Sequence, residues 1–397
     1  MEERKVLNLI YDYFEKNKFF ESSKTLVEES GIPINKDIIN STFPLQHVLD
    51  EYENSSRINI SLPNALLLPG DNTYINKASM SLNYITEGEN ILSTNFSDDR
   101  DLILGTAKGK TILIKIPECI DGIKEEQLIL NANTYHNHKG GVLDVDINPC
   151  RRLFLSGGMD RKIYLTELSY EDKKPLQEWS VHNKYVVRVR WAPSGKSFIS
   201  GSYDNSVNFF REDKTVTNHY YNVKALKFGG SVEAVCFLKN EDTAVISIRN
   251  DHRLHIFNCD DDPYQTRCIN MNAIGDNFVS FTAMDICVSP DNNFVTVATD
   301  TSRIILYEIK TGQQLLNFYG ATNDGFSQPR HCWHPDGHYL YSTSQDNCIY
   351  VWEISTQQIV SKLKVHTNVV RHISISDKLK ILVSGGYDAT AVLWKRV

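Results

Sequence analysis

The amino-acid sequence predicts a mainly β protein, a closed ring of seven small antiparallel sheets known as a β-propeller, preceded by a short α-helical hairpin. Three observations lead to this prediction. A His, Ser and Asp pattern recurs at constant spacing, β-rich runs fill the intervals between its copies, and residues 1–32 carry helical spacing. Repeats with a period of tens of residues indicate stacked or ring-shaped architectures.

In the recurring pattern, a His precedes an Asp by 22 residues and a Ser stands four residues before that Asp. Short apolar, β-branched and aromatic runs separated by Pro, Gly and Asp turns follow each copy, as is typical of antiparallel strands. The three segments that align without a gap contain His138, Ser156 and Asp160; His182, Ser200 and Asp204; and His366, Ser384 and Asp388.

Weaker copies complete the repeat. They pair Ser247 with Asp251, Thr296 with Asp300 and Ser342 with Asp346, without a His at the matching place. Successive Asp positions lie 42 to 49 residues apart, close to the roughly 40–45 residues of a propeller blade. A seventh copy runs from Ile91 to Ile114 with Lys108 in place of the Asp. Residues 74–397 are therefore predicted to form seven blades.

These features resemble the WD-repeat family, and the unit ending in Trp394 carries the full set of family markers. Thr166, Phe210, Phe257 and Leu306 stand in the place of that Trp in other units. The Asp can accept from the imidazole, the imidazole can bond the Ser, and the Ser can bond the Trp indole, which gives a buried network that stabilises a blade when every member is satisfied. The last blade lacks a fourth strand at its end of the chain, and we expect residues near Tyr74–Tyr84 to supply it.

The N-terminal residues 1–32 read as two short helices joined by a turn at Asn17-Lys18. Helices this short bury little area alone, so their apolar faces need a partner. Residues 33–73 contain four prolines and little periodicity, and are predicted to be a linker with one short helix between Leu45 and Tyr52.

The N-terminal residues resemble the lissencephaly-homology (LisH) motif. The matching positions are Tyr13-Phe14, Asn17-Lys18-Phe19, Ser22-Ser23, Leu26 and Glu28-Glu29, with Lys18 where the family has glycine. The resemblance implies a homodimer through a four-helix bundle; the alternative is a hairpin packed on its own propeller. The expected dimerisation residues are Val6, Ile10, Tyr13, Phe14, Phe19 and Leu26.

Composition narrows the function. The net charge of −7 argues against a dedicated nucleic-acid binder, which usually carries a basic stripe. No apolar run approaches the roughly 18 residues of a membrane helix, and the N-terminus lacks a signal-peptide core. We therefore expect an intracellular protein, in the nucleus, the cytoplasm or both, with its scattered cysteines as buried thiols.

Several motifs imitate active sites. The His, Ser and Asp set suggests a hydrolase, but it recurs in three units and lacks a Gly-x-Ser-x-Gly elbow. The loop from Gly105 to Thr111 resembles a phosphate loop but is one residue short and precedes a strand. The cluster His331-Cys332-Trp333-His334 could suggest zinc, yet alternate strand residues point to opposite faces. We therefore predict no catalytic residues, no metal and no cofactor.

The Asp turns predict a binding surface, because the His-bearing loops and Asp-bearing turns share one end of a propeller. The residues just before each Asp should line that rim, and Tyr and Met are common in protein interfaces. The alternative is that Tyr203 and Tyr387 only pack against neighbouring loops. The rim candidates are Met159, Tyr203, Asn250, Thr299, Gln345 and Tyr387, with Tyr185 nearby.

The leading functional hypothesis is a non-catalytic scaffold, a dimeric subunit of a multiprotein complex that binds other proteins or peptides. A substrate receptor of a ubiquitin ligase is the narrower alternative, and an adaptor partner found by co-purification would distinguish the two.

Overall fold

The computed structural model describes residues 63–396, apart from 98, 99, 119, 121, 131, 170–173, 240, 260, 261, 274 and 324–327. The residues from Pro63 onward form one compact unit. The predicted LisH-like hairpin, its six dimerisation residues and the short helix at Leu45–Tyr52 lie outside the described residues.

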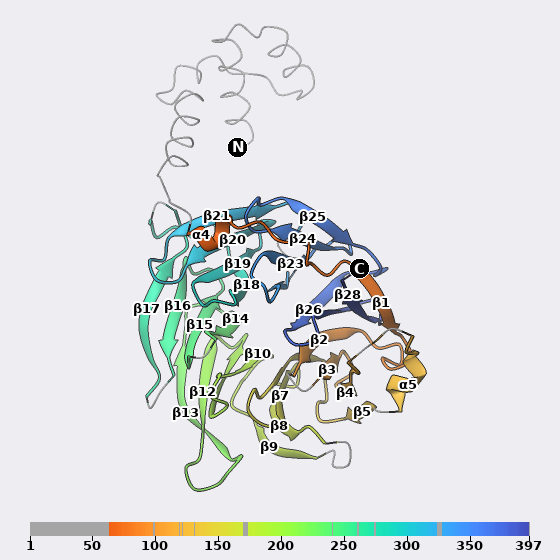
Figure 1. The fold of residues 1–397 in the computed structure, drawn as a ribbon. Coiled ribbons are helices and arrows are strands. Elements are labelled where there is room, and N and C mark those ends of the chain that lie inside the picture. The colour runs from red at the N-terminus through yellow and green to blue at the C-terminus, as the bar shows by residue number, and fades with distance from the viewer. Residues whose placement is uncertain are drawn as a thin grey trace, which may run out of the picture. The chain divides into compact units, whose positions relative to one another are not determined.

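The described chain folds into seven four-stranded antiparallel sheets arranged in a ring, so the predicted seven-bladed propeller is confirmed (Figure 1). Each blade begins with an inner strand beside the central channel and ends with an outer strand at the periphery. We number the blades in chain order. Blade 1 is β2–β5, blade 2 is β6–β9, blade 3 is β10–β13, blade 4 is β14–β17, blade 5 is β18–β21, blade 6 is β22–β25, and blade 7 is β26–β28 with β1.

The strands occupy equivalent places from blade to blade. The inner strands are β2 (Ile91–Phe96), β6 (Val142–Ile147), β10 (Val186–Trp191), β14 (Val232–Phe237), β18 (Ala283–Val288), β22 (His331–Trp333) and β26 (Val370–Ser376). The second strands are β3 (Asp101–Thr106), β7 (Leu153–Gly158), β11 (Ser197–Ser202), β15 (Thr243–Ile248), β19 (Phe294–Thr299), β23 (Tyr339–Thr343) and β27 (Ile381–Gly386). The third strands are β4 (Thr111–Lys115), β8 (Ile163–Glu167), β12 (Ser206–Glu212), β16 (Arg253–Asn258), β20 (Arg303–Glu308), β24 (Ile349–Glu353) and β28 (Ala391–Lys395). The outer strands are β5 (Ala132–Tyr135), β9 (Pro175–Trp179), β13 (Tyr220–Lys227), β17 (Tyr264–Asn270), β21 (Gln314–Tyr319), β25 (Ile359–Leu363) and β1 (Lys77–Leu82).

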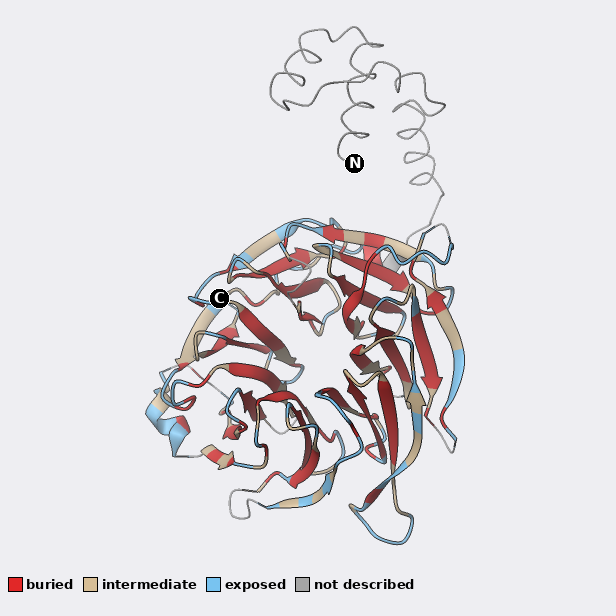
Figure 2. Cartoon of the chain, turned by 180° about the vertical axis from the view of Figure 1, so that it is seen from behind, coloured by how far each residue is buried: buried red, intermediate tan, exposed pale blue. Residues whose placement is uncertain are grey.

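The core lies between neighbouring blades. The second strands are buried along almost their whole length, as in β7 and β11, whereas the outer strand β9 alternates between partly buried and exposed residues (Figure 2). A strand with blades packed against both faces reads as a continuous apolar run, and a strand with one solvated face alternates. This difference explains why the second strands are the clearest strands in the sequence.

The ring is closed by residues from the other end of the propeller sequence. Strand β1 pairs antiparallel with β28, and this register sets Lys77 opposite Lys395 and Leu82 opposite Ala391. The prediction that residues near Tyr74–Tyr84 complete the last blade is confirmed. In the closed ring the sheets are separate and radial, which leaves only short, protected edges.

The chain leading into β1 is fixed to blade 6. The backbone N–H of Gly70 donates to Glu353 at 2.9 Å, and that of Ile75 donates to the Tyr341 hydroxyl at 2.7 Å. A Cβ at Gly70 would lie 2.1 Å from the Tyr339 hydroxyl, so this close approach needs a glycine. Contacts with the ring thus begin before residue 74, within the segment assigned to the linker from sequence.

In the described part of the chain, two short helices lie outside the ring of strands, α4 (Asn64–Leu67) and α5 (Glu125–Ile129). The Glu125 carboxylate accepts hydrogen bonds from the backbone N–H groups of Tyr84 and Ile85 at 2.7 and 3.0 Å. Helix α5 therefore holds the segment that follows β1.

Candidate protein-binding site

The turn of blade 7 contains the complete hydrogen-bond network. Trp394 Nε1 lies 2.8 Å from Ser384 Oγ, which lies 2.7 Å from His366 Nε2, and His366 Nδ1 lies 2.9 Å from Asp388 Oδ2. Because an indole N–H can only donate, it donates to the Ser oxygen, which frees the Ser O–H for the imidazole and leaves Nδ1–H to donate to the carboxylate. Every polar group of this network that is named here has a hydrogen-bond partner, which is the condition under which such a buried network stabilises a blade.

Blades 2 and 3 hold the same triad without the Trp. His138 Nδ1 lies 2.9 Å from Asp160 and its Nε2 lies 2.8 Å from Ser156. His182 Nδ1 lies 3.2 Å from Asp204 and its Nε2 lies 2.7 Å from Ser200. Burial lowers the pKa of His182, and the Asp204 charge only partly offsets this. The ring is therefore neutral, in agreement with one donating and one accepting nitrogen.

Two blades depart from the alignment expected from sequence. In blade 3, Gly201 pairs with Arg188 and Ser202 pairs with Val186. The equivalent residues are Ser247 and Ile248 in blade 4, and Ala298 and Thr299 in blade 5. Relative to the Ser200–Asp204 marker of blade 3, the Ser247–Asp251 marker is thus one residue too late and the Thr296–Asp300 marker one residue too early. For the same reason Tyr307, rather than Leu306, occupies the Trp394 place in blade 5.

A recurring backbone hydrogen bond defines the rim position. The N–H of Tyr203 donates to the carbonyl of Tyr185 at 3.1 Å, and the N–H of Tyr387 donates to that of Val369 at 3.0 Å. Met159 makes the equivalent bond to Gly141, Arg249 to Ser231 and Asp300 to Thr282. Arg249 and Asp300 therefore occupy the rim, and the predictions of Asn250 and Thr299 for these two blades were wrong by the same one-residue slip.

The inner strands carry β-bulges at the matching end. In β10, pairing with β11 passes from Val186 to Arg188 and skips Val187. A bulge places two residues opposite one and re-aims a side chain. Five other inner strands have the same irregularity, and the skipped residues are Leu92, Leu143, Val187, Glu233, Met284 and Arg371.

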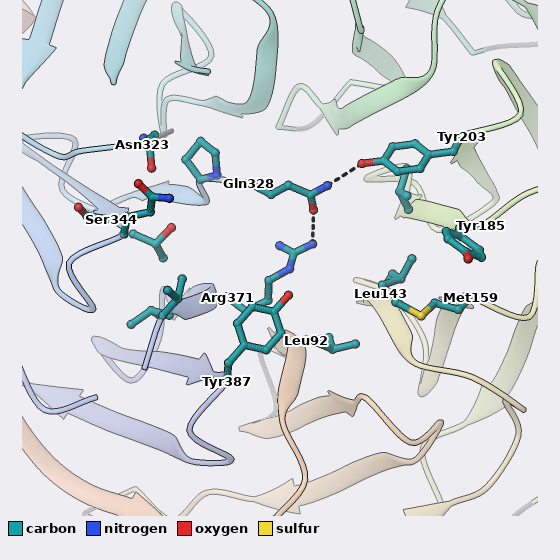
Figure 3. A pocket seen from close by; sticks show the side chains of 16 residues that line it. Leu92, Leu143, Met159, Tyr185, Tyr203, Asn323, Gln328, Ser344, Arg371 and Tyr387 are labelled. Atoms are coloured by element: carbon teal, nitrogen blue, oxygen red, sulfur yellow. Dashed lines mark hydrogen bonds between the residues drawn. The ribbon is translucent and has the colours of Figure 1, made fainter. Parts of the chain in front are cut away.

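Rim and bulge residues of blades 1, 2, 3, 6 and 7 line a cavity of about 480 Å³ at this end of the ring (Figure 3). Five of the seven rim candidates from sequence line it, namely Met159, Tyr185, Tyr203, Gln345 and Tyr387. Cavities of this size that combine apolar walls with a few polar groups are typical of binding sites. The structure therefore brings all five to one place.

The cavity lining combines apolar and polar side chains. Leu92, Leu143 and Val187 form a buried cluster against which Tyr203 packs. Gln328 and Arg371 supply polar groups to the lining, and Gln328 lies between Tyr203 and Arg371 (Figure 3). Its Nε2 donates to the Tyr203 hydroxyl at 2.6 Å, and its Oε1 accepts from Arg371 Nη2. Tyr203 thus has a structural partner as well as a face in the cavity.

A second depression, of about 860 Å³, continues from the first over blades 2 to 4. It shares Met159, Tyr185 and Tyr203 with the cavity, and adds the cations Arg161, Lys184 and Arg249. The other lining residues are Asn183, Asn205 and Ser231. Neither depression is lined by an Asp or a Glu, although the chain as a whole is acidic.

Beneath the cavity, charged side chains cross the channel. Arg188 Nη2 lies 3.2 Å from Asp285 Oδ1, although the two residues belong to blades 3 and 5. Burial opposes ionisation of Asp285, but Arg330, His331 and Arg188 outweigh it and hold the pKa of that carboxyl below its usual range. Burial, together with the Arg188 and Arg371 charges, lowers the pKa of Arg330. The channel is therefore filled by paired charges beneath the cavity.

The residues that imitate active sites have structural partners. Ser156, Ser200 and Ser384 are buried within their blades, away from any substrate. His331 Nε2 lies 2.9 Å from Thr296 Oγ1, and His334 Nδ1 lies 2.8 Å from Asp336. Among the described residues, no three His, Cys, Asp or Glu side chains gather as metal ligands would. Within that part of the chain, no helix has the length and apolarity that crossing a bilayer requires.

Sequence reasoning named five of the sixteen residues that line the cavity and missed the rest. Leu92, Leu143, Val187 and Arg371 follow the first residue of an inner strand, where alternation alone does not show which face they take. Gln328 lies in the connection between blades 5 and 6 and carries no repeat signal. A systematic extra residue at the start of each inner strand is the only available sign, and it requires the strand registers to be known.

Comparisons with known proteins agree with this architecture. The family model "WD domain, G-beta repeat" matches residues 131–166, 173–211, 326–353 and 357–395. The serine-threonine kinase receptor-associated protein of Bos taurus is 22% identical over 235 residues, which cover 59% of this chain and 59% of that protein, and the Homo sapiens protein matches equally. Pre-mRNA-processing factor 19 of Oryza sativa subsp. japonica is 21% identical over 69% of this chain and 42% of its own length. The matched region thus spans about three fifths or less of these relatives.

Among solved structures, the WD40 β-propeller domain of Doa1 superposes with a TM-score of 0.61 at 15% identity, covering 81% of this chain and 97% of that domain. Identity at that level shows the fold alone. Together with the seven closed sheets, the matches lead to one conclusion: the chain is a seven-bladed β-propeller that contains WD40 repeats.

Proposed function

We propose that this protein is a non-catalytic interaction scaffold that binds segments of partner proteins in the cavity at the Asp-turn end of its propeller. The observation that carries the proposal is the convergence of the five rim residues on one cavity. Exposed aromatic and Met side chains around a concavity are the usual anchors of protein interfaces. Met159 is 42% exposed, Tyr185 47% and Tyr387 39%.

The relatives support the same class of role. One relative is named for its association with a receptor and another for its part in pre-mRNA processing, and WD40 propellers in general serve as interaction platforms rather than as enzymes. The buried positions of the Ser hydroxyls in the three His, Ser and Asp sets agree with this. An intracellular location is part of the proposal.

The sharpest test uses Tyr185, whose ring is not tied into the fold by the Gln328 bridge. Affinity purification of the full chain, with partners identified by mass spectrometry, is compared between the wild type and Tyr185→Ala. Truncation of a central interface Tyr commonly costs about 2 kcal/mol or more, over tenfold in affinity. We expect partner recovery to fall at least tenfold, with an unchanged melting temperature.

The matched control is Tyr221→Ala, because Tyr221 is 46% exposed but lies on outer strand β13, opposite Arg211 near the other end of the blade. Lys196→Ala at that end is a second control. Equal loss of partners in Tyr185→Ala and Tyr221→Ala would contradict the proposed face. Early melting of Tyr203→Ala would show that Tyr203 is structural, as its bond with Gln328 allows.

The proposal includes homodimerisation through the LisH-like residues 1–32, on the sequence resemblance alone. Light scattering should find a dimer for the full chain and a folded monomer after deletion of residues 1–32. A monomeric full chain at micromolar concentration would contradict dimerisation without affecting the binding face. Co-purification of a cullin-type adaptor would assign the narrower role of a ubiquitin-ligase substrate receptor.

A further inference from the structure

We infer that the cavity takes an acidic peptide, with one Asp or Glu carboxylate bound by Arg371 and an adjacent apolar side chain on the Leu92, Leu143 and Val187 cluster. The inference rests on the proposed function and names the chemistry of the partner.

The first argument is an unused donor. Arg371 is only 8% exposed, and it lines the cavity. Its Nη2 donates to Gln328 and the Tyr387 hydroxyl lies beside the guanidinium, but its buried Nη1 makes no hydrogen bond of good geometry with the described residues. A buried charged donor without a partner is costly to a fold. A carboxylate oxygen in the cavity would satisfy it with a charge-assisted hydrogen bond.

The second argument is the segregation of charge. The cavity wall contributes Arg371 and the continuing depression contributes Arg161 and Lys184, whereas Arg249 in that depression pairs with the buried Glu233 at 2.6 Å. No carboxylate lines either depression. In a chain of net charge −7, such a surface selects anionic partners and excludes basic ones. The second depression provides positions for further acidic residues of the same segment.

The third argument separates a carboxylate from a phosphate. Phosphate groups carry nearly two charges and are usually held by several cationic donors. Here Arg188 pairs with Asp285 and Arg330 donates to the Pro329 carbonyl at 3.0 Å, although Arg330 Nε has no partner among the described residues. Neither of these two guanidinium groups lines the cavity, so Arg371 is its only lining guanidinium among the described residues. One free Nη1 suits a monoanion.

The fourth argument is the apolar wall. Leu92, Leu143 and Val187 are almost completely buried, yet their cluster lines the same cavity as Arg371. An apolar side chain next to the acidic residue would cover this wall. The ligand is therefore acidic and apolar in neighbouring positions, rather than simply polyanionic.

The experiment selects ligands from a random dodecapeptide library displayed on phage, with the full chain as the target. We expect selected peptides to be enriched in Asp or Glu beside Leu, Ile, Phe or Met. Enrichment in basic or uncharged sequences would overturn the inference. The strongest peptide is then synthesised with its acidic residue as Glu, Gln and phosphoserine, and binding is measured by fluorescence anisotropy at two salt concentrations.

Two variants test the contact. Arg371→Gln should weaken the Glu peptide at least tenfold and leave the Gln peptide nearly unchanged. Gln328→Glu should have the same effect, because a carboxylate of the same shape next to Arg371 would occupy the site from within. Gln328→Glu keeps a partner for the Tyr203 hydroxyl and should fold even if Arg371→Gln does not. Lys196→Gln, at the other end of the propeller, is the charge-matched control.

The outcomes separate this inference from the proposed function. Loss of peptide binding in Tyr185→Ala with full binding in Arg371→Gln and Gln328→Glu would retain the binding face and overturn the carboxylate contact. Tenfold tighter binding of the phosphoserine peptide would overturn the assignment of a monoanion. Selected peptides that Tyr185→Ala, Arg371→Gln and Gln328→Glu all leave unaffected would count against both.

Discussion

Blades 5 and 7 present the same turn on different supports. In both blades the backbone N–H of the rim residue donates to a backbone carbonyl, from Asp300 to Thr282 and from Tyr387 to Val369. In both, a residue with φ +59° closes the turn, Ser302 in blade 5 and Ala389 in blade 7. Blade 7 holds this turn with His366, Ser384, Asp388 and Trp394. Blade 5 has no His in its loop, and the Asp300 carboxylate accepts only from the Thr282 N–H at 2.9 Å.

Blade 5 is instead held by its neighbours. Asp285 on its inner strand pairs with Arg188 of blade 3, and Thr296 on its second strand accepts from Trp333 Nε1 of blade 6 at 3.0 Å. The turn geometry is thus a property of the backbone, whereas its stabilisation can come from inside a blade or from outside it. A blade that lacks the family markers need not be weakly anchored.

The largest loss in the free energy of unfolding should come from removing the contacts that neighbouring blades make with blade 5. Asp285→Ala leaves Arg188 and Arg330 as buried charges without their carboxylate. Breaking a buried ion pair by removing one partner costs about 3–5 kcal/mol. Chemical denaturation should show a loss of this order. A loss below that of Asp388→Ala would contradict external anchoring.

Asp388→Ala should have the next largest effect. The change removes the hydrogen-bond acceptor of His366 Nδ1 and of the N–H groups of Thr367 and Thr390, which lie 3.0 and 3.2 Å from the carboxylate. Loss of a buried partner costs about 1–3 kcal/mol. The lowered melting temperature should be accompanied by intact secondary structure, and an unchanged melting temperature would show that the network is dispensable.

Lowering the pH should remove the stabilising contribution of the same network in the wild-type protein. Burial raises the pKa of Asp388, but the bonds from His366 and Thr390 outweigh it and bring the pKa to about 2. The unfolded carboxyl has a pKa of about 3.9, so its contribution is complete above pH 4 and is lost as the pH falls toward 2. Denaturation midpoints measured from pH 5 to pH 2 should therefore fall more steeply for the wild type than for Asp388→Asn. Parallel slopes would contradict the assignment.

The smallest effect is expected for Asp300→Ala, which removes one acceptor from one N–H group at a turn that retains its backbone bond. We expect a loss below about 1 kcal/mol, within the ordinary range for one partly buried hydrogen bond. Differential scanning calorimetry beside Asp388→Ala checks the order. Equal shifts for the two variants would remove the distinction between the blades.

The fold was predictable because its markers are local and repeated. The constant interval from His138 to Asp160, repeated in two other units, fixed the period, and the β-rich runs fixed the strands. The rim positions Met159, Tyr203 and Tyr387 followed from the same interval. The slips in blades 4 and 5 have a physical cause, since side chains alternate every two residues and one residue of error moves a side chain to the other face. Without a His, nothing local set the register there.

The sequence by itself determined the period, the strands, the three triads and the closing strand of the ring, because each depends on residues close in the chain or on a repeat that can be counted. Only the tertiary structure decided that the bulges of separate blades turn Leu92, Leu143, Val187 and Arg371 into one cavity, and that Gln328 joins Tyr203 to Arg371. These residues come from blades far apart in sequence. Their meeting depends on ring closure, which brings every inner strand to one axis, and no local pattern encodes which of their side chains face one another.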